Sequence, residues 1–330
     1  MSTGRVEVGK ENSVKDLSPE AEEIVEEIKN LGLSIFFLGD DRKLQSDQFP
    51  EEEEERYVVD LFRKEQLLRR ESRAAAPAEF TARDAELTHS IERTGAWIRQ
   101  RLIQESTRGE AGAQQIYANI VRKINKRGVS KIQNYENQKA ALIRSLKELH
   151  ERSTFFAEFG LMAKINSSPF IKALVRATQT KFPSVAQVVS SYIDVQKARL
   201  DALDQLNQLL YRFVKQINTF FIDKKIFLDL KKPDVLSIVT NAGLPLRSEN
   251  LSSGEKQLLL LFCNVLASSE SASLFIVDEP EISLNVKWQR YLIDALLDLA
   301  GGSKCQFLLA THSIELLAKH RRQVIKLQPR

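Results

Sequence analysis

An α/β fold is predicted by two short apolar runs and by the helices that alternate with them. The runs 273–277 and 306–310 have the length and composition of buried strands, and each leads into polar side chains. Helices predicted over 256–267 and 285–300 lie on either side of the first run. Strands that alternate with helices imply a parallel sheet covered by helices on both faces.

A long helical pattern precedes this part of the chain. It begins at Asp84 and continues for almost 140 residues, interrupted by prolines in 166–169 and 181–183. Two sets of apolar residues within it follow the 3-4 spacing of coiled coils. They are Ile132, Tyr135, Leu142, Leu146 and Leu149, and then Leu203, Leu206, Leu210, Phe213, Ile217 and Phe220. An antiparallel helical hairpin and a compact helical bundle both fit this pattern.

Composition favours a cytoplasmic protein without a membrane segment. The chain has 330 residues, 43% of them hydrophobic, and a mean hydropathy of −0.27. Its longest apolar run, 258–267, is about half as long as a membrane-spanning helix. Cys263 and Cys305 lie in apolar surroundings without metal-ligand spacing, so we expect reduced thiols. The net charge of +4 is weak support for nucleic-acid binding, because 44 acidic residues nearly balance 48 basic ones.

The segment 251–257 (LSSGEKQ) has the features of a phosphate-binding helix start. Ser252 and Ser253 can cap the helix, and Gly254 lets the backbone come close to a ligand. Unpaired N–H groups and the helix dipole make such an N-terminus attractive to anions. The sequence therefore predicts a phosphate contact here.

Three charged or polar residues follow the two predicted strands. The first strand delivers Asp278 and Glu279 to the carboxyl edge of the sheet, and the second delivers His312 to the same edge. One carboxylate can hold Mg²⁺ while the next positions water. Taken singly, these residues also fit a solvated strand end and a helix cap. Together with the segment 251–257 they predict a nucleotide hydrolysis site.

These motifs resemble the C-terminal half of an ABC-type ATPase head of the SMC, RecF and OLD-like group, the AAA family ATPases of DNA-repair or phage-defence type. In that family LSSGE corresponds to the signature motif, and LFIVDEP, which ends at Pro280, to the Walker B strand. Residues 283–285 (SLN) correspond to the D-loop and His312 to the switch histidine. The resemblance covers about a third of the chain, from Lys225 onward. Ser253 replaces the commoner glycine of the signature.

The resemblance implies a role for each site residue and a P-loop NTPase core sheet with a large, partly coiled-coil-like helical insertion. Asp278 would hold Mg²⁺ or its water ligands, Glu279 would polarise the attacking water, and His312 would contact the γ-phosphate. The remaining contacts would be made with ATP, those of the signature with ATP held by the opposite subunit: Ser252, Ser253, Gly254, Glu255 and Asn285. Two heads would then form a homodimer around two ATP molecules.

The Walker A loop of such an ATPase is missing from the sequence. The segment 4–11 (GRVEVGKE) has P-loop spacing, but only three residues precede it and Glu11 replaces the metal-binding hydroxyl. A polar terminus without fixed structure is the favoured interpretation. An N-terminal lobe lost from this reading frame, a partner that supplies the loop, and a degenerate pseudo-ATPase remain open, and we favour the first.

The predicted organisation therefore has three parts. Residues 1–83 are interpreted as a remnant of the N-terminal ABC lobe with a linker, and a strand is expected over 33–38. Residues 84–223 form the helical insertion or arm. Residues 224–330 form the C-terminal lobe, which opens with paired strands at 225–230 and 235–240 and closes with a strand at 324–327.

The leading functional hypothesis is an ATP-binding and ATP-hydrolysing head that dimerises with ATP in DNA repair or anti-phage defence. DNA and a nuclease or other effector subunit are its expected partners, by family analogy. A truncated or degenerate scaffold without ATPase activity is the alternative, and the missing Walker A loop is its main support. The ATPase subunit of a membrane transporter is a third hypothesis, but the long helical insertion suits it less well.

Overall fold

The structure is a computed structural model that describes residues 35–38, 44–46, 82–124, 135–268, 274–301 and 305–326. Side chains are described within 84–113, 135–267, 274–301 and 305–326. The P-loop-like segment 4–11 lies outside the described residues.

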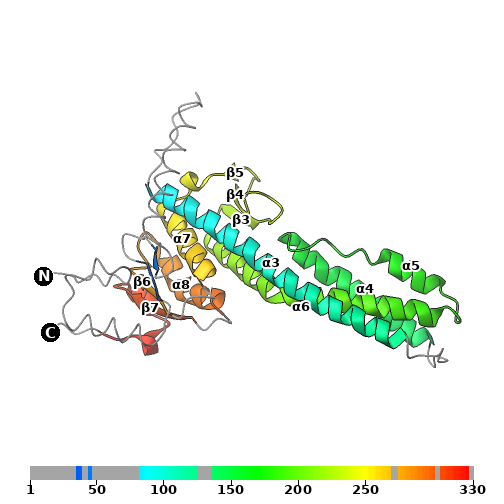
Figure 1. The fold of residues 1–330 in the computed structure, drawn as a ribbon. Helices are drawn as coiled ribbons and strands as arrows, with labels where there is room; N and C mark the ends of the chain where they lie inside the picture. The colour runs from blue at the N-terminus through cyan, green and yellow to red at the C-terminus, as the bar shows by residue number, and fades with distance from the viewer. Residues whose placement is uncertain are drawn as a thin grey trace, which may run out of the picture. The chain divides into compact units, whose positions relative to one another are not determined.

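The chain divides into two compact units, shown in Figure 1. The sheet unit comprises residues 1–94, 213–226 and 237–330, and the helical unit comprises 95–212 and 227–236. Two divisions fall within the helices 82–124 and 182–220 and two within the strands 224–228 and 236–240, whereas boundaries were expected near residues 84 and 223. The first turns after Asp84 therefore belong to the sheet unit, where Lys256 forms an ion pair with the Asp84 carboxylate.

A four-stranded sheet in the order β2-β1-β6-β7 forms the centre of the sheet unit. The strands are β1 (Ile35–Leu38), β2 (Leu44–Ser46), β6 (Leu274–Asp278) and β7 (Gln306–Ala310). β1, β6 and β7 are parallel, and β2 runs antiparallel to β1. The strands predicted at 33–38 and at both C-terminal runs are therefore confirmed.

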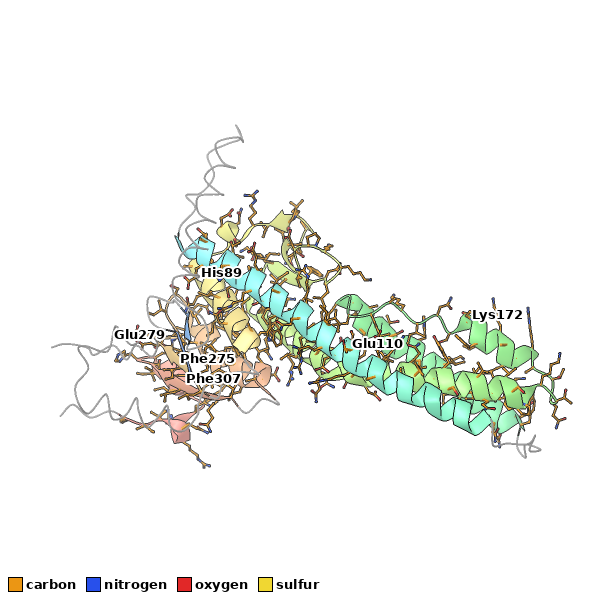
Figure 2. All side chains as sticks on the ribbon, viewed as in Figure 1. His89, Glu110, Lys172, Phe275, Glu279 and Phe307 are labelled. Carbon is orange, nitrogen blue, oxygen red and sulfur yellow. The ribbon has the colours of Figure 1, made fainter. Side chains whose placement is uncertain are left out.

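Two helices cover one face of this sheet. They are α7 (Ser253–Ser268), whose apolar residues from Leu258 to Leu266 are buried, and α8 (Val286–Leu299). Phe275 and Val277 of β6 point into this core, and Phe275 lies beside Phe307 of β7 (Figure 2). The neighbouring β6 residues are only half-buried, and Leu308 of β7 is 53% exposed. The sequence predicted a sheet covered by helices on both faces. Within the described residues, this prediction is wrong.

A second sheet joins β3 (Lys224–Leu228), β4 (Leu236–Thr240) and β5 (Pro245–Leu246) in that order. The paired strands predicted before the signature are thereby confirmed. Gly243 has φ +81° in the turn between β4 and β5, where its amide donates to the Thr240 carbonyl. A glycine suits this left-handed conformation because it has no Cβ.

The C-terminal segment contains α9 (Ile314–Leu317) and a 3₁₀ turn, η3 (Arg321–Gln323). The strand predicted at 324–327 is wrong at its described residues, because 324–326 have no strand conformation. Ile325 is 84% exposed, so its side chain does not pack against the sheet. No described helix is both long enough and apolar enough to cross a membrane.

The helical unit contains α3 (Ala82–Ile124) from Gly95 onward, α4 (Tyr135–Glu158), α5 (Ser168–Arg176) and most of α6 (Phe182–Phe220). The helix breaks predicted at 166–169 and 181–183 are confirmed, and the proline of each segment lies in the first turn of the helix that follows, α5 or α6, where a missing N–H is tolerated. All six residues of the second predicted apolar stripe, from Leu203 to Phe220, are buried.

Contacts among these helices show a packed bundle rather than an isolated hairpin. A Cβ on Gly109 of α3 would lie 3.3 Å from the Arg199 Cα of α6, so the two backbones approach closely. Phe170 of α5 stacks on Tyr192 of α6 with ring centroids 4.0 Å apart. The Ser167 hydroxyl, at the start of α5, donates to a carbonyl of α4. The bundle alternative is therefore the one observed.

The two cysteines predict a simple reactivity test of the fold. Burial raises the pKa of the Cys263 thiol to about 12, since Thr94 and Arg93 offset only part of the desolvation, and Cys305 is half-buried. Because thiolates are the reactive form, we expect Ellman's reagent to modify Cys305 alone in the native protein at pH 8. Cys263 should react only after unfolding. A Cys305→Ser variant is the control, and immediate reaction of its remaining thiol would contradict the burial of α7.

Candidate functional site

The expected catalytic pair meets at the carboxyl edge of the large sheet. Asp278 ends β6 opposite Ala310 of β7, and the Glu279 amide donates to the Ala310 carbonyl at 2.8 Å. This register brings His312 Nε2 to 3.9 Å from Glu279 Oε1. The His312 side chain is 93% exposed and that of Glu279 38% exposed, so both are open to a ligand or a second molecule. Figure 2 shows Glu279 at this edge.

The turn after β6 has an unusual backbone. Glu279 has φ 45° and Ser283 has φ 66°, a left-handed conformation that costs non-glycine residues on the order of 1 kcal/mol or more each. Hydrogen bonds from the Ile282 amide to the Glu279 carbonyl and from the Leu284 amide to the Glu281 carbonyl close the turn. Such strain persists only where the surroundings hold it, and it is typical of functional sites. The direction of the Glu279 side chain is therefore fixed by the fold.

The signature turn, residues 251–257, begins α7 with a capping box. The Ser252 amide and hydroxyl donate to Glu255 Oε2 at 2.7 and 2.9 Å, and the Glu255 amide donates back to the Ser252 hydroxyl at 3.4 Å. The predicted cap by Ser252 is confirmed, while Ser253 is the first helical residue. Within the described residues, the amides of Ser253 and Gly254 have no hydrogen-bond acceptor, which leaves two donors for an anion.

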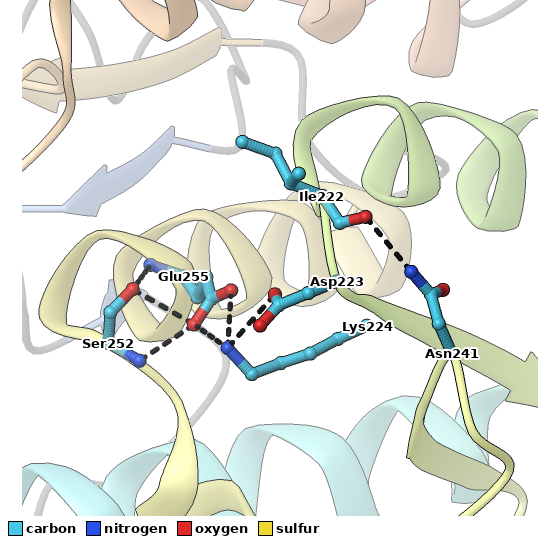
Figure 3. A network of polar contacts seen from close by, with 6 residues as sticks. All are labelled: Ile222, Asp223, Lys224, Asn241, Ser252 and Glu255. Atoms are coloured by element: carbon cyan, nitrogen blue, oxygen red, sulfur yellow. Dashed lines mark hydrogen bonds and ion pairs between the residues drawn. The ribbon is translucent and has the colours of Figure 1, made fainter.

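Glu255 has a structural role that sequence analysis missed. Lys224 Nζ of β3 lies 3.0 and 3.1 Å from its two carboxylate oxygens, and Asp223 lies 3.4 Å from the same ammonium (Figure 3). Burial by itself would lower the pKa of Lys224, but the hydrogen bond and charge of Glu255 outweigh it and raise the pKa. The Glu255 carboxylate is thus engaged within its own chain, which differs from the nucleotide contact implied for it.

Gly254 lies against the D-loop, residues 283–285. A Cβ at this position would lie 2.6 Å from the Ser283 carbonyl oxygen and 3.3 Å from Cζ3 of Trp288. Contacts under 3.0 Å do not occur for real Cβ atoms, so only glycine fits unless the backbone moves. The signature and the D-loop of one chain therefore form a single packed surface.

Asn285 ends the D-loop as the N-cap of α8. Its side-chain oxygen accepts from the Trp288 amide at 3.0 Å, and Asn285 is exposed. Asparagine is among the favoured residues at this position. Its side chain therefore serves the helix start, and the structure shows no further task for it.

Two residues that sequence analysis did not single out connect the turn after β6 and the D-loop to the segment around His312. Glu281 Oε1 accepts from the Thr311 hydroxyl and, at 3.0 Å each, from the amides of His312 and Ser313. Gln289 of α8 donates to the Leu284 carbonyl at 2.9 Å and accepts from the Ser313 hydroxyl at 2.7 Å. The position of Glu281 directly after Glu279 and Pro280 was the available signal, but its partners depend on the neighbouring strand.

These residues fit a metal and a phosphate in part. Asp278 and Glu279 supply the oxygen ligands that Mg²⁺ prefers, and the start of α7 supplies amide donors. No group of three or more metal-ligating side chains gathers in the described part of the chain. A magnesium ion held by one carboxylate and by nucleotide phosphates matches this sparse set, as in phosphoryl-transfer sites in general.

Comparison with known proteins gives a family match over most of the chain. Residues 6–318 match the family described as "AAA domain, putative AbiEii toxin, Type IV TA system". A 78-residue stretch is 37% identical to the lipoprotein-releasing system ATP-binding protein LolD of Ruegeria pomeroyi and covers 24% of this chain and 33% of that protein.

Solved structures of SMC heads are similar at a low level. The Smc head domain of Pyrococcus furiosus with an extended coiled coil, bound to the C-terminal domain of ScpA, is 14% identical, with a TM-score of 0.29, over 66% of this chain and 52% of that one. The Smc head domain of Pyrococcus yayanosii with a coiled coil and joint is 17% identical, with a TM-score of 0.28, over 90% and 59%. The chain spans a third to three-fifths of the lengths of these three proteins.

Proposed function

Because this chain belongs to the AAA family of ABC-type ATPases described as AbiEii-like toxins of Type IV toxin–antitoxin systems, we propose that it is an ATP-binding and ATP-hydrolysing head that dimerises on ATP. The observation that carries this proposal is the sheet edge where Glu279 and His312 approach to 3.9 Å beside Asp278. A carboxylate and an imidazole held in register by two parallel strands suit water activation next to a phosphate.

The residues at this edge divide the chemistry among them. Asp278 would hold Mg²⁺ or orient its water ligands, and bound Mg²⁺ neutralises charge on the phosphates. Glu279, held by its left-handed backbone, would polarise the attacking water. His312 would hydrogen-bond to the terminal phosphate from the opposite side, and its exposure leaves room for this contact.

The position of the signature turn supports the proposed dimerisation. The amides of Ser253 and Gly254, which have no acceptor within the described residues, can donate hydrogen bonds to a phosphate at the start of α7. We propose that this phosphate belongs to ATP held by a second copy, so that ATP joins two heads and hydrolysis releases them. ATP would then act as a switch between two association states.

The cellular role proposed for this switch is defence or DNA repair. The family description names a toxin of a Type IV toxin–antitoxin system, which favours a defence role. DNA and a nuclease or other effector subunit are the partners that we propose for the helical unit. They rest on the family alone, because no described side-chain cluster selects a nucleic acid.

A hydrolysis-blocked variant tests the proposed function. Glu279→Gln keeps the size of the side chain but removes the carboxylate, so we expect MgATP to convert the variant into a long-lived dimer, measured by light scattering after gel filtration. Asp278→Ala should keep, in the presence of MgATP, the mass that it has without nucleotide. Glu110→Gln, an exposed site on α3, should behave as the wild type. An unchanged mass of Glu279→Gln with and without MgATP would refute the proposal.

A second candidate, a scaffold that uses the ATPase fold only to bind a partner, is favoured by one observation. The sequence contains no Walker A motif with a strand before it and a Ser or Thr after its lysine. Titration with a fluorescent ATP analogue separates the two functions. Binding that is lost in Asp278→Ala supports the ATPase, whereas no binding by the wild type supports the scaffold.

A further inference from the structure

From these contacts we infer that Glu281 is a positioning residue that fixes the switch turn, residues 311–313, and through it His312. Among the described residues, the His312 side chain makes no contact that could hold it, apart from its 3.9 Å approach to Glu279, and it is 93% exposed. An exposed imidazole acts reproducibly on a phosphate only if its backbone is held. The described contacts place this task on Glu281.

One carboxylate oxygen holds three consecutive residues. Glu281 Oε1 accepts from the Thr311 hydroxyl and from the amides of His312 and Ser313, both at 3.0 Å. The Thr311 hydroxyl also accepts from the Ser313 amide at 3.0 Å, which tightens the turn. Hydrogen bonds to a charged acceptor are about twice as strong as neutral ones. Glu281 therefore joins the switch turn to the segment that precedes the D-loop.

Glu281 is itself held on a constrained backbone. It lies between Glu279 and Ser283, the two non-glycine residues with left-handed φ angles among those described. Its carbonyl accepts from the Leu284 amide at 2.9 Å, and its second carboxylate oxygen is buried and has no hydrogen-bond partner in the described part of the chain. The loss of solvation at one carboxylate oxygen destabilises the fold, and the three hydrogen bonds to the other oxygen offset part of this cost. A functional role would explain why a carboxylate stands at this position.

Gln289 provides a second connection between the same elements. Its amide nitrogen donates to the Leu284 carbonyl at 2.9 Å, and its amide oxygen accepts from the Ser313 hydroxyl at 2.7 Å. Ser313 in turn caps α9, since its hydroxyl accepts from the Leu316 amide at 3.2 Å. Glu281 and Gln289 therefore hold the switch turn from the two ends of the D-loop. A shift of the D-loop would move His312 with it.

The role in catalysis rests on the proposed function, whereas the anchoring of the turn can be measured without nucleotide. Amide hydrogen exchange of the full chain, followed by mass spectrometry on peptides that cover 306–318, reports the anchoring. We expect Glu281→Ala to lower protection of the His312 and Ser313 amides by about tenfold or more, because their charged acceptor is lost. Glu281→Gln should lose less, because its amide oxygen can replace Oε1.

The catalytic consequence is measured by steady-state ATP hydrolysis on the same variants. Since a misplaced His312 affects the transition state more than substrate binding, we expect Glu281→Ala to lower kcat by about 10- to 100-fold with little change in KM. Glu281→Gln should recover part of this loss. Asp294→Asn, which removes the charge of the Asp294–Lys319 ion pair but leaves the switch turn intact, should match the wild type in both measurements.

Two results would overturn the inference. Unchanged exchange at 312 and 313 in Glu281→Ala would show that the carboxylate does not anchor the turn. Lost protection with an unchanged kcat would show that anchoring does not serve catalysis. An absence of ATP turnover by the wild type would instead refute the proposed function, and the exchange data alone would then decide whether Glu281 holds the turn.

Discussion

Replacing Gly254 with alanine is expected to abolish ATP-driven dimerisation and to destabilise the sheet unit. The new Cβ would lie 2.6 Å from the Ser283 carbonyl oxygen, which is backbone and has no rotamer to change. Overpacking of this kind costs about 1–3 kcal/mol, more than the gain of up to about 1 kcal/mol that alanine brings to a helix interior. The signature and the D-loop would have to separate, and both are proposed to face the nucleotide.

Gly112→Ala provides the matched control for this substitution. Gly112 also lies in a helix, but the nearest atom to its added Cβ is the Ala198 Cβ at 3.8 Å, an ordinary contact. We therefore expect Gly112→Ala to be neutral or stabilising by up to about 1 kcal/mol, the opposite sign. Denaturant midpoints of the two variants measure the effect on stability. Light scattering of the same substitutions, made in a chain that also carries Glu279→Gln, measures the effect on dimerisation. Equal stability of the two variants would contradict the close approach at Gly254.

Replacing Lys224 with methionine is expected to cost about 3 kcal/mol of unfolding free energy, because it leaves a buried carboxylate without its cation. The side chains of Lys224 and Glu255 are only 16% and 6% exposed, so salt should screen the effect weakly. Chemical denaturation of Lys224→Met measures the loss. Lys225→Met is the control, because Lys225 is the exposed neighbour on the same strand and should change stability little.

The pH dependence of this effect has a definite sign. The folded pKa of Lys224 is raised above its unfolded value, so its stabilising contribution is fully present below about pH 10 and is lost as the pH rises through the folded pKa. The difference between the wild type and Lys224→Met should thus stay constant from neutral pH to about pH 9 and shrink above pH 10. A difference that shrinks toward neutral pH would contradict the ion pair.

A double variant separates the ion pair from the capping role of Glu255. Lys224→Met with Glu255→Gln should lose less stability than the sum of the two single losses, since each single change leaves a partner uncompensated. Glu255→Gln alone keeps an acceptor for the Ser252 amide and hydroxyl. Strict additivity would indicate that Glu255 acts only as a helix cap.

The sequence by itself determined the local features of this protein. Strands β6 and β7 follow from apolar runs, and the cap of α7 follows from Ser252 and Glu255 at capping-box spacing. The buried stripe of α6 follows from its 3-4 spacing. The order of the motifs identified the ATPase family, which the match over 6–318 confirms. These features depend on residues that are close in the chain, so the periodicity or spacing of those residues predicts them.

Only the tertiary structure decided which distant residues meet. The register of β6 against β7 brings Glu281 to the switch turn, and the approach of α7 to the D-loop makes Gly254 irreplaceable. The ion pair between Lys224 and Glu255 joins β3 to the start of α7. The helical unit is a bundle because α5 packs against α6 and is joined to α4, while the α3 and α6 backbones approach at Gly109. Each outcome depends on how separate elements pack, and no pattern within one segment encodes the position of another.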